Sequence, residues 1–139
     1  IVEKLFKQIN SNSGLGAYGL DEILNYLKNN VVDTIIITNN VDLYRIESKC
    51  TKCNDIQEKI VERIKVIKIK TELKNTPCLL CKSSEIEVSE QDIIDYISLL
   101  SAKTGTAVEV ISGVSEHGSM ISNIGKIGAI LRYNPNYTN

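Results

Sequence analysis

Apolar side chains recur at two different spacings along this chain, and each spacing predicts one kind of element. At the start, Val2, Leu5, Phe6 and Ile9 repeat at helical intervals, which predicts a helix with one apolar face. Further on, residues 34–38 are an uninterrupted β-branched run, which is typical of a strand covered on both faces. Between these segments a second helix is predicted, with its own apolar face and an acidic first turn.

The later part of the chain continues this alternation. Strands are predicted at residues 43–48, 86–88, 107–112 and 128–133. A helix with Ile93, Ile94 and Ile97 inward is predicted after the second of these strands, and Ser89-x-x-Asp92 resembles its N-terminal cap. A second cap, at Ser115, is predicted to begin a shorter helix. Helices thus alternate with strands rich in Ile and Val, which predicts the α/β class: a three-layer α/β/α sandwich around a mixed, mostly buried sheet.

The stretch over residues 55–75 fits more than one element. Ile56, Ile60, Val61 and Ile64 fit a helix, whereas the alternation over residues 66–71 fits a strand. A zinc-ribbon hairpin would also account for much of this stretch. The sequence leaves these alternatives open.

Length and charge limit the classes of protein to which the chain can belong. At 139 residues it is predicted to be one domain with a small insert, long enough to bury a core of its own. Its 16 basic and 17 acidic side chains nearly cancel, which argues against a broad surface for binding DNA or RNA. No apolar run is long enough to span a bilayer. Because the chain begins at Ile1 and not Met, it is predicted to be a fragment of a longer protein.

Four cysteines, the only ones in the chain, form two C-x-x-C hooks. Cys50 and Cys53 make the first hook, and Cys78 and Cys81 make the second. Each hook places two sulfurs on one side of a tight turn, so two hooks supply the four thiolates that a structural Zn²⁺ prefers. The sequence therefore predicts a small zinc-binding minidomain, inserted at about residues 45–88.

Other uses of the cysteines remain open at this point. Disulfides would need an oxidising compartment, and the chain shows no secretory leader. A redox C-x-x-C pair normally occurs singly, beside the start of a βαβ unit. Iron could occupy the same thiolates, although zinc suits a structural role better. Asn54, just after the first hook, suits the left-handed backbone that such a knuckle often needs, whereas Lys82 after the second hook is less suited.

Signatures of catalysis are weak. His117 is the only histidine, and the sequence gives it no partner, so a surface position is favoured. Gly14, Gly16 and Gly19 form G-x-G-x-x-G, but a predicted helix precedes them where a dinucleotide site needs a strand. We therefore interpret these glycines as a turn whose backbone requires small residues, and we predict no cofactor other than the structural metal.

Several segments, taken in order, carry a family resemblance. They are residues 16–19, 32–37, the two C-x-x-C hooks, 108–112, 116–119 and 125–133. Their order resembles the C-terminal domain of class 1 peptide-chain release factors of the archaeal and eukaryotic type. The final Gly-x-Ile-Leu-Arg-Tyr-like strand is the most specific segment, and the paired hooks favour the archaeal branch.

The resemblance implies a non-catalytic docking domain. In this family an N-terminal domain reads stop codons and a Gly-Gly-Gln loop in a middle domain triggers hydrolysis of peptidyl-tRNA; neither motif occurs in this chain. The C-terminal domain docks the translational GTPase, which in archaea is elongation factor one-alpha, and contacts the ABC-type ATPase that recycles ribosomes. The resemblance thus implies a cytoplasmic, ribosome-associated protein without membrane or direct DNA binding.

The resemblance also suggests partner-binding residues. The family's GTPase contacts involve the region of the last strand, so Arg132 and Tyr133 are candidates for that surface. For Arg132, a local ion pair is an equal alternative. The family often has glycine where Lys126 stands, which leaves the role of this turn open.

A different class of protein remains as the alternative. A stand-alone α/β/α domain with a zinc ribbon could bind RNA or associate with the ribosome. Lys65, Lys68 and Lys70 form a modest basic strip that supports this alternative, whereas the near-neutral charge argues against it. A related ribosome-rescue factor shares the fold and the GTPase-binding task but usually lacks the cysteines.

Overall fold

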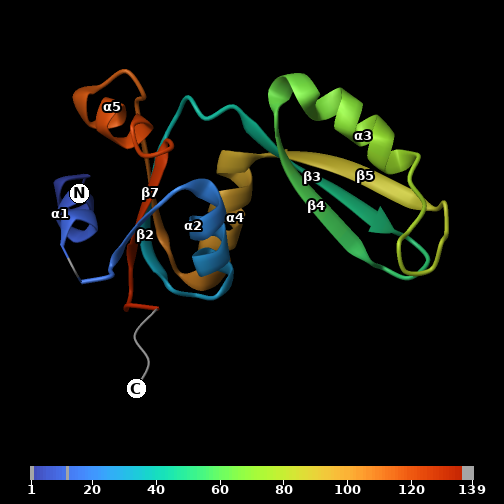
Figure 1. Ribbon diagram of the computed structural model, residues 1–139, viewed down its shortest axis with the longest axis horizontal. Helices are drawn as coiled ribbons and strands as arrows, with labels where there is room; N and C mark the ends of the chain where they lie inside the picture. Colours follow the sequence, from blue (N-terminus) through green and yellow to red (C-terminus); the bar gives the residue numbers. More distant parts are fainter. Residues whose placement is uncertain (1, 12, 136–139) are drawn as a thin grey trace. The chain divides into compact units, whose positions relative to one another are not determined.

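The computed structural model describes residues 2–11 and 13–135, which form two compact units (Figure 1). The larger unit combines Ile1–Val41 with Ile97–Asn139, and the smaller unit is Asp42–Tyr96. The described residues contain five α-helices and two β-sheets, so the predicted α/β class is confirmed. No helix in this described part is long and apolar enough to cross a membrane.

The larger unit is built on a four-stranded sheet of order β1-β7-β2-β6. Strand β2 pairs in parallel with β6 and antiparallel with β7, while β1 pairs antiparallel with β7. Its elements in chain order are α1 (Val2–Asn10), β1 (Gly16–Tyr18), α2 (Leu20–Lys28), β2 (Val32–Thr38), β6 (Ala107–Ile111), α5 (Glu116–Ser122) and β7 (Ile127–Leu131). Helix α4 (Ile93–Thr104) begins in the smaller unit and ends in the larger one.

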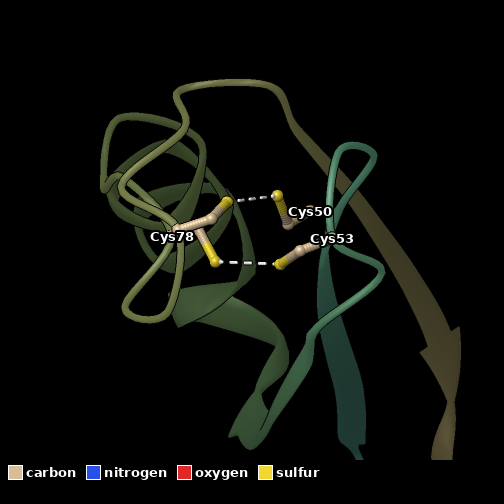
Figure 2. Close-up of side chains that lie close together, drawn as sticks. Cys50, Cys53 and Cys78 are labelled. Carbon is tan, nitrogen blue, oxygen red and sulfur yellow. Dashed lines mark hydrogen bonds between the residues drawn. The ribbon is translucent and has the colours of Figure 1, made fainter.

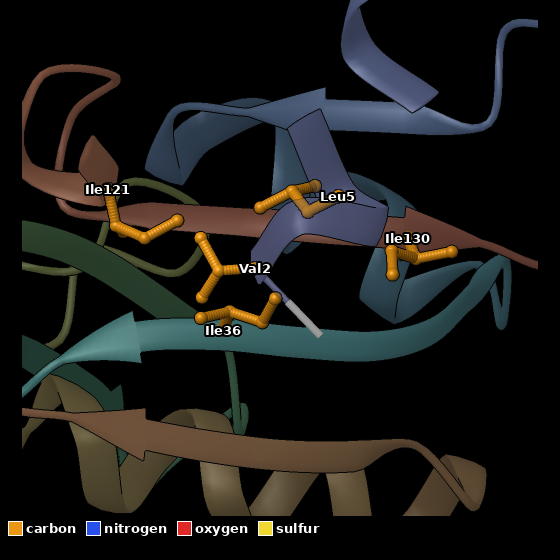
Figure 3. Close-up of a cluster of buried hydrophobic side chains, with 5 residues drawn as sticks. All are labelled: Val2, Leu5, Ile36, Ile121 and Ile130. Carbon is orange, nitrogen blue, oxygen red and sulfur yellow. The ribbon is translucent and has the colours of Figure 1, made fainter. Parts of the chain in front are cut away.

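The core of the larger unit lies on both sides of β2. Ile35, Ile36 and Ile37 are all 0% exposed, as the β-branched run predicted. On one face, Ile36 and Ile130 of the sheet pack with three helical side chains (Figure 3). These are Val2 and Leu5 of α1 and Ile121 of α5. Because successive strand residues point to opposite faces, Ile35 and Ile37 supply the core on the other side.

Strand β1 is an element that the sequence reading missed. The glycine-rich segment was interpreted as a turn, but Gly16–Tyr18 pairs with β7 and places Ala17 opposite Ala129. A Cβ atom on Gly16 would lie 2.6 Å from the backbone nitrogen of Ile9, so glycine is what allows α1 to approach this strand. Such a close approach depends on tertiary packing, and periodicity does not reveal it.

The N-terminal cap of α4 differs from the predicted one. Ser89 lies inside a strand, and it is Asp92 that caps the helix. The Asp92 carboxylate accepts hydrogen bonds from the backbone N–H groups of Ile94, at 2.8 Å, and Asp95, at 3.3 Å. By contrast, the predicted cap at Ser115 is confirmed, because its hydroxyl accepts from the N–H of Gly118 at 2.9 Å.

The smaller unit consists of a three-stranded antiparallel sheet of order β4-β3-β5 and one helix. Its elements are β3 (Leu43–Cys50), β4 (Ile56–Glu62), a single 3-10 turn η1 (Arg63–Lys65), α3 (Val66–Lys74) and β5 (Ile86–Asp92). Both specific interpretations of the spacer were therefore wrong: the expected helix is β4, and the expected strand is α3. Val66, Ile69 and Leu73 recur at helical spacing; Val66 is buried, and Ile69 and Leu73 are half-buried. Lysines at alternate positions concealed that pattern.

Candidate metal centre

The first hook continues directly from a strand. Cys50 is the last residue of β3, and its backbone N–H donates to the carbonyl of Asp55 at 2.9 Å. The N–H of Asn54 donates back to the carbonyl of Cys50 at 2.8 Å, which closes the turn. Asn54 adopts the left-handed conformation, with φ of 64°, as its sequence position predicted.

The second hook repeats the same turn. Cys78 N–H donates to the carbonyl of Ser83 at 2.8 Å, and Lys82 N–H donates to the carbonyl of Cys78 at 3.0 Å. Lys82 also has φ of 64°, although lysine was expected to suit this position less well. The two hooks are therefore copies of one backbone motif, even though their side chains differ.

A β-ladder and a short bridge hold the two hooks side by side. Cys50 pairs with Ile86 in the β3–β5 ladder. Beside it, the backbone N–H and the hydroxyl of Thr51 both donate to the carbonyl of Glu85, at 2.9 and 3.1 Å. The segment that follows the second hook is thus fixed against the first hook.

The four sulfurs converge on one point (Figure 2). All four cysteines are free thiols, and their sulfur atoms lie within 4.8 Å of one another. Two sulfur–sulfur hydrogen-bond contacts cross between the hooks: Cys50 to Cys81 and Cys53 to Cys78, both at 3.5 Å. Sulfurs bound to Zn²⁺ at about 2.3 Å in a tetrahedron lie roughly 3.8 Å apart. The spacing in this chain therefore fits a single tetrahedral ion.

Backbone N–H groups favour the thiolate form at the inner sulfur of each hook. The N–H groups of Cys53 and Lys52 hydrogen-bond to Cys50 and, against the effect of burial, lower its pKa to about 7. Cys78 receives the same pair of bonds from the N–H groups of Cys81 and Leu80, and its pKa is lowered as well. These bonds would support a thiolate ligand in the same way when a metal is bound.

The outer sulfurs are protonated more readily. The N–H of Asp55 acts to lower the pKa of Cys53, but the hydrogen bond with Cys78 and burial together raise it to about 12. At Cys81 the N–H of Ser83 likewise acts to lower the pKa, whereas burial and the bond with Cys50 raise it overall. In each crossed pair, the inner sulfur therefore has the lowered pKa and the outer sulfur the raised pKa.

The fold agrees with the comparisons with known proteins. The family described as eRF1 domain 3 matches residues 1–135 of the chain. The chain belongs to this family. The peptide chain release factor subunit 1 of Methanocaldococcus jannaschii is 37% identical to it over 134 residues, which is 95% of this chain and 32% of that protein. The chain thus spans about a third of the length of the curated relatives it matches.

Solved structures agree with the family assignment. The C-terminal domain of the peptide chain release factor from Methanosarcina mazei has a TM-score of 0.79 at 28% identity, covering 98% of this chain and 82% of that one. An archaeal Pelota, seen bound to the ribosome with ABCE1, shares the fold with a TM-score of 0.50 at 19% identity, covering 95% of this chain and 25% of that one. The resemblance to release factors stated from the sequence is therefore confirmed.

Arg132 and Tyr133, the predicted partner-binding residues of this eRF1 domain 3 chain, lie just beyond β7. The strand was expected to reach Tyr133 but ends at Leu131. The Arg132 guanidinium donates to the side-chain oxygen of Asn30 at 2.8 Å and to the carbonyl of Thr104, the last residue of α4, at 2.6 Å. A cation at a helix C-terminus is favourable, so Arg132 has a local structural role. Tyr133 is 54% exposed.

The basic strip proposed from the sequence does not lie along a strand. Lys65 ends the 3-10 turn, and Lys68 and Lys70 lie in α3. Lys70 is paired with Glu90 at 2.9 Å. His117 is exposed in the first turn of α5, in agreement with the surface position favoured for it.

A half-buried arginine and a cavity were missed by sequence reasoning. Arg45 on β3 donates to Glu58 at 2.6 Å and to Glu47 at 2.9 Å, and it lies over the ring of Tyr96 at 4.6 Å. A cavity of about 260 Å³ lies beside Cys50 and Cys78. Its lining includes Leu73, Thr76 and Pro77, at and beyond the end of α3. The contacts of Arg45 depend on strand register, and the cavity depends on α3. The sequence analysis predicted neither the register nor this helix, because the local pattern contains no direct signal for them.

Proposed function

We propose that this chain is a non-catalytic docking domain of a translation termination factor. The observation that carries the proposal is the family match over residues 1–135, together with the likeness to a release-factor C-terminal domain. In the complete factor, other domains would read the stop codon and trigger peptidyl-tRNA hydrolysis. The absence of Gly-Gly-Gln from the sequence is consistent with this division of labour.

The partners proposed are the translational GTPase, elongation factor one-alpha in archaea, and the ABC-type ribosome-recycling ATPase. The shared fold with a Pelota that was solved with ABCE1 on the ribosome supports the ATPase and the ribosome as partners. The GTPase is proposed from the family resemblance alone. A cytoplasmic location follows from work on the ribosome.

Tyr133 is the better candidate of the two proposed partner residues. Its side chain is 54% exposed, whereas the guanidinium of Arg132 is already bonded to Asn30 and Thr104. We therefore expect Tyr133 to contribute apolar area at a partner surface, and Arg132 to hold the backbone beneath it.

The proposed role of the cysteine centre is to hold one structural Zn²⁺ and thereby stabilise the smaller unit. The support is the donor set: thiolates alone, in two equivalent knuckles, with backbone N–H groups directed at the inner sulfurs. Bound Zn²⁺ would offset half of the charge of the four thiolates and cross-link β3 to the segment before β5. On this proposal, the smaller unit is the metal-binding minidomain predicted as the insert, and the complete chain is the C-terminal part of a longer factor.

We also propose that the larger unit is the three-layer α/β/α sandwich predicted from the sequence. Helices α1 and α5 supply side chains to one face of its sheet. Ile35 and Ile37 of β2 face the opposite side, where Ile23 and Leu27 of α2 are also fully buried. These observations support helical layers on both faces.

The experiment that tests the docking function is a binding assay with the purified GTPase. The chain should bind it, and Tyr133→Ala should weaken the complex about tenfold or more. As a matched control, Tyr18→Ala changes a tyrosine of similar exposure, 51%, and should leave binding unchanged. Steeply salt-dependent binding to RNA without binding to the GTPase would instead favour the RNA-binding alternative.

A further inference from the structure

The two sulfur–sulfur hydrogen-bond contacts in the cysteine centre cross from one hook to the other (Figure 2). Four cysteines allow three pairings, and the 3.5 Å contacts select one of them. We propose that hydroperoxides oxidise this centre crosswise, joining Cys50 to Cys81 and Cys53 to Cys78 and releasing the metal. This inference rests on the metal site of the proposed function, and it adds a site of reversible oxidative modification.

Each crossed pair combines one exposed and one buried cysteine residue. Cys53 and Cys81 are exposed, whereas Cys50 is 2% and Cys78 is 6% exposed. Oxidation of cysteine follows both thiolate character and accessibility. With metal bound all four ligands would be thiolates, so a peroxide arriving from solvent meets a thiolate first at Cys53 or Cys81. The buried partner is shielded from the peroxide and lies within reach of the sulfur that has been oxidised.

The reaction proceeds in two balanced steps at each pair. The exposed thiolate attacks the O–O bond of the hydroperoxide; an S–O bond forms, the O–O bond breaks, and the other oxygen leaves as hydroxide or alkoxide. The product is a sulfenic acid. The buried thiolate then attacks that sulfur; an S–S bond forms, the S–O bond breaks, and the oxygen leaves as hydroxide, which takes up a proton to become water. One hydroperoxide thus accepts two electrons from each pair, and two hydroperoxides oxidise the whole centre.

The backbone around the hooks can accommodate the closing movement. A disulfide is about 2.05 Å long, so each 3.5 Å pair must close by about 1.5 Å. Cys50 is fixed at the end of β3, but the second hook lies in a segment between Lys74 and Ile86 that contains no helix or strand. Glu85 stays bonded to Thr51, and the Cys78–Cys81 turn before it, which belongs to no helix or strand, can adjust towards the first hook.

Oxidation changes what the centre can hold. A disulfide sulfur lacks the negative charge of a thiolate, so it no longer competes for the metal. Each crosswise bond closes a loop of chain that contains β4 and α3, which restricts the unfolded state. The oxidised, metal-free chain should therefore unfold at a higher temperature than the reduced, metal-free chain. A thiol reductant and zinc should restore the starting state.

The test is a disulfide map of the full chain after treatment with hydrogen peroxide. Trypsin cuts after Lys52 and separates the cysteines of the first hook, while chymotrypsin cuts after Leu79 or Leu80 and separates those of the second. Mass spectrometry of the unreduced digest should recover peptides joined as Cys50–Cys81 and Cys53–Cys78. Metal content, measured in parallel, should fall from one equivalent to none as these peptides form.

Two single variants check the pairing independently. In Cys53→Ser, peroxide should join Cys50 to Cys81 and leave Cys78 free; in Cys50→Ser, it should join Cys53 to Cys78 and leave Cys81 free. Bonds within a hook, bonds between two chains, or sulfinic acids without disulfides would overturn the proposal. An untreated protein without metal would contradict the proposed zinc site instead, and the map of the reduced, metal-free chain would still decide the pairing.

Discussion

Asn54 and Lys82 occupy equivalent positions after the two cysteine hooks, and both have a backbone φ of 64°. Asparagine tolerates this left-handed conformation better than lysine, so the second hook stores strain that the first largely avoids. We expect Lys82→Gly to stabilise the metal-loaded smaller unit by about 0.5–1 kcal/mol, since glycine adopts positive φ without a Cβ penalty.

Lys52→Gly is the matched control for that change. Lys52 is also exposed and also lies in a hook, but it is not among the residues with positive φ. Glycine there should only add freedom to the unfolded chain and so lower stability. Thermal unfolding, monitored through the release of the metal, distinguishes the two variants. An equal loss of stability in both variants would contradict the strain argument.

Removing the metal should unfold the smaller unit alone. The larger unit has its own core around Ile36, so Cys50→Ser or chelation should abolish hydrogen-exchange protection in β3 and β4 and preserve it in β2. Ser84→Ala, an exposed change next to the second hook, should retain both metal and protection. Loss of protection in β2 on chelation would show that the larger unit depends on the metal.

Metal binding should release fewer protons than four ordinary thiols would release. The pKa of Cys50 is lowered to about 7 and that of Cys78 is also lowered, so both lose their protons at a lower pH than an ordinary thiol does. Cys53, with its pKa raised to about 12, and Cys81, also raised, remain protonated and must lose protons to bind. At pH 8 we expect fewer than four protons per zinc ion, and affinity that falls as the pH falls. Calorimetry in buffers of different ionisation enthalpy counts these protons; release of four would contradict the lowered pKa values.

Two arginines in the smaller unit offer a paired test of burial. Arg45 is bonded to Glu47 and Glu58 and lies over Tyr96, with 14% of its side chain exposed. Lysine cannot reproduce this forked, stacked arrangement, so Arg45→Lys should cost about 1–2 kcal/mol of unfolding free energy.

Arg63 makes a similar set of contacts at the surface, with Asp42 at 3.1 Å and the Tyr44 ring at 5.9 Å, but 68% of its side chain is exposed. Solvent screens that pair, so Arg63→Lys should not measurably change stability. Denaturant titration of both variants is the measurement. An equal loss of unfolding free energy in both variants would show that burial does not determine how much these contacts stabilise the protein.

Helix α5 should not tolerate a methyl group at Gly118. A Cβ atom there would lie 1.8 Å from the carbonyl oxygen of Ser112, which is backbone and cannot move aside easily. We expect Gly118→Ala to destabilise the larger unit by about 3 kcal/mol. The neighbouring exposed Ser119→Ala should have little effect, as judged by urea unfolding. A tolerated alanine at Gly118 would mean that the loop carrying Ser112 moves away.

The sequence predicted correctly those features of the fold that depend on residues close together in the chain. The buried strand β2 follows from its β-branched run. The cap at Ser115 follows from the position of its hydroxyl, three residues before the N–H of Gly118 that it accepts from. The convergence of the cysteines follows in the same way, because two tight hooks with no other thiols have few alternatives.

The failures all involve features decided by distant parts of the chain. Strand β4 is an edge strand with mostly exposed side chains, so its apolar residues show no alternation and imitate a helix. Helix α3 buries few side chains beneath a lysine-rich surface. The positions of Arg45 over Tyr96 and of Gly16 against α1 depend on strand register and helix packing, which no local pattern contains.

The β3–β5 ladder has a consequence for protein engineering. Tyr44 near the start of β3 lies opposite Asp92 at the end of β5. Paired residues on antiparallel strands have Cα atoms about 5 Å apart, so the chain leaves and returns through almost the same point. A turn of a few residues could bridge that gap, and the whole cysteine-bearing module could be excised, or exchanged for a reporter or an epitope, without stretching the chain on either side.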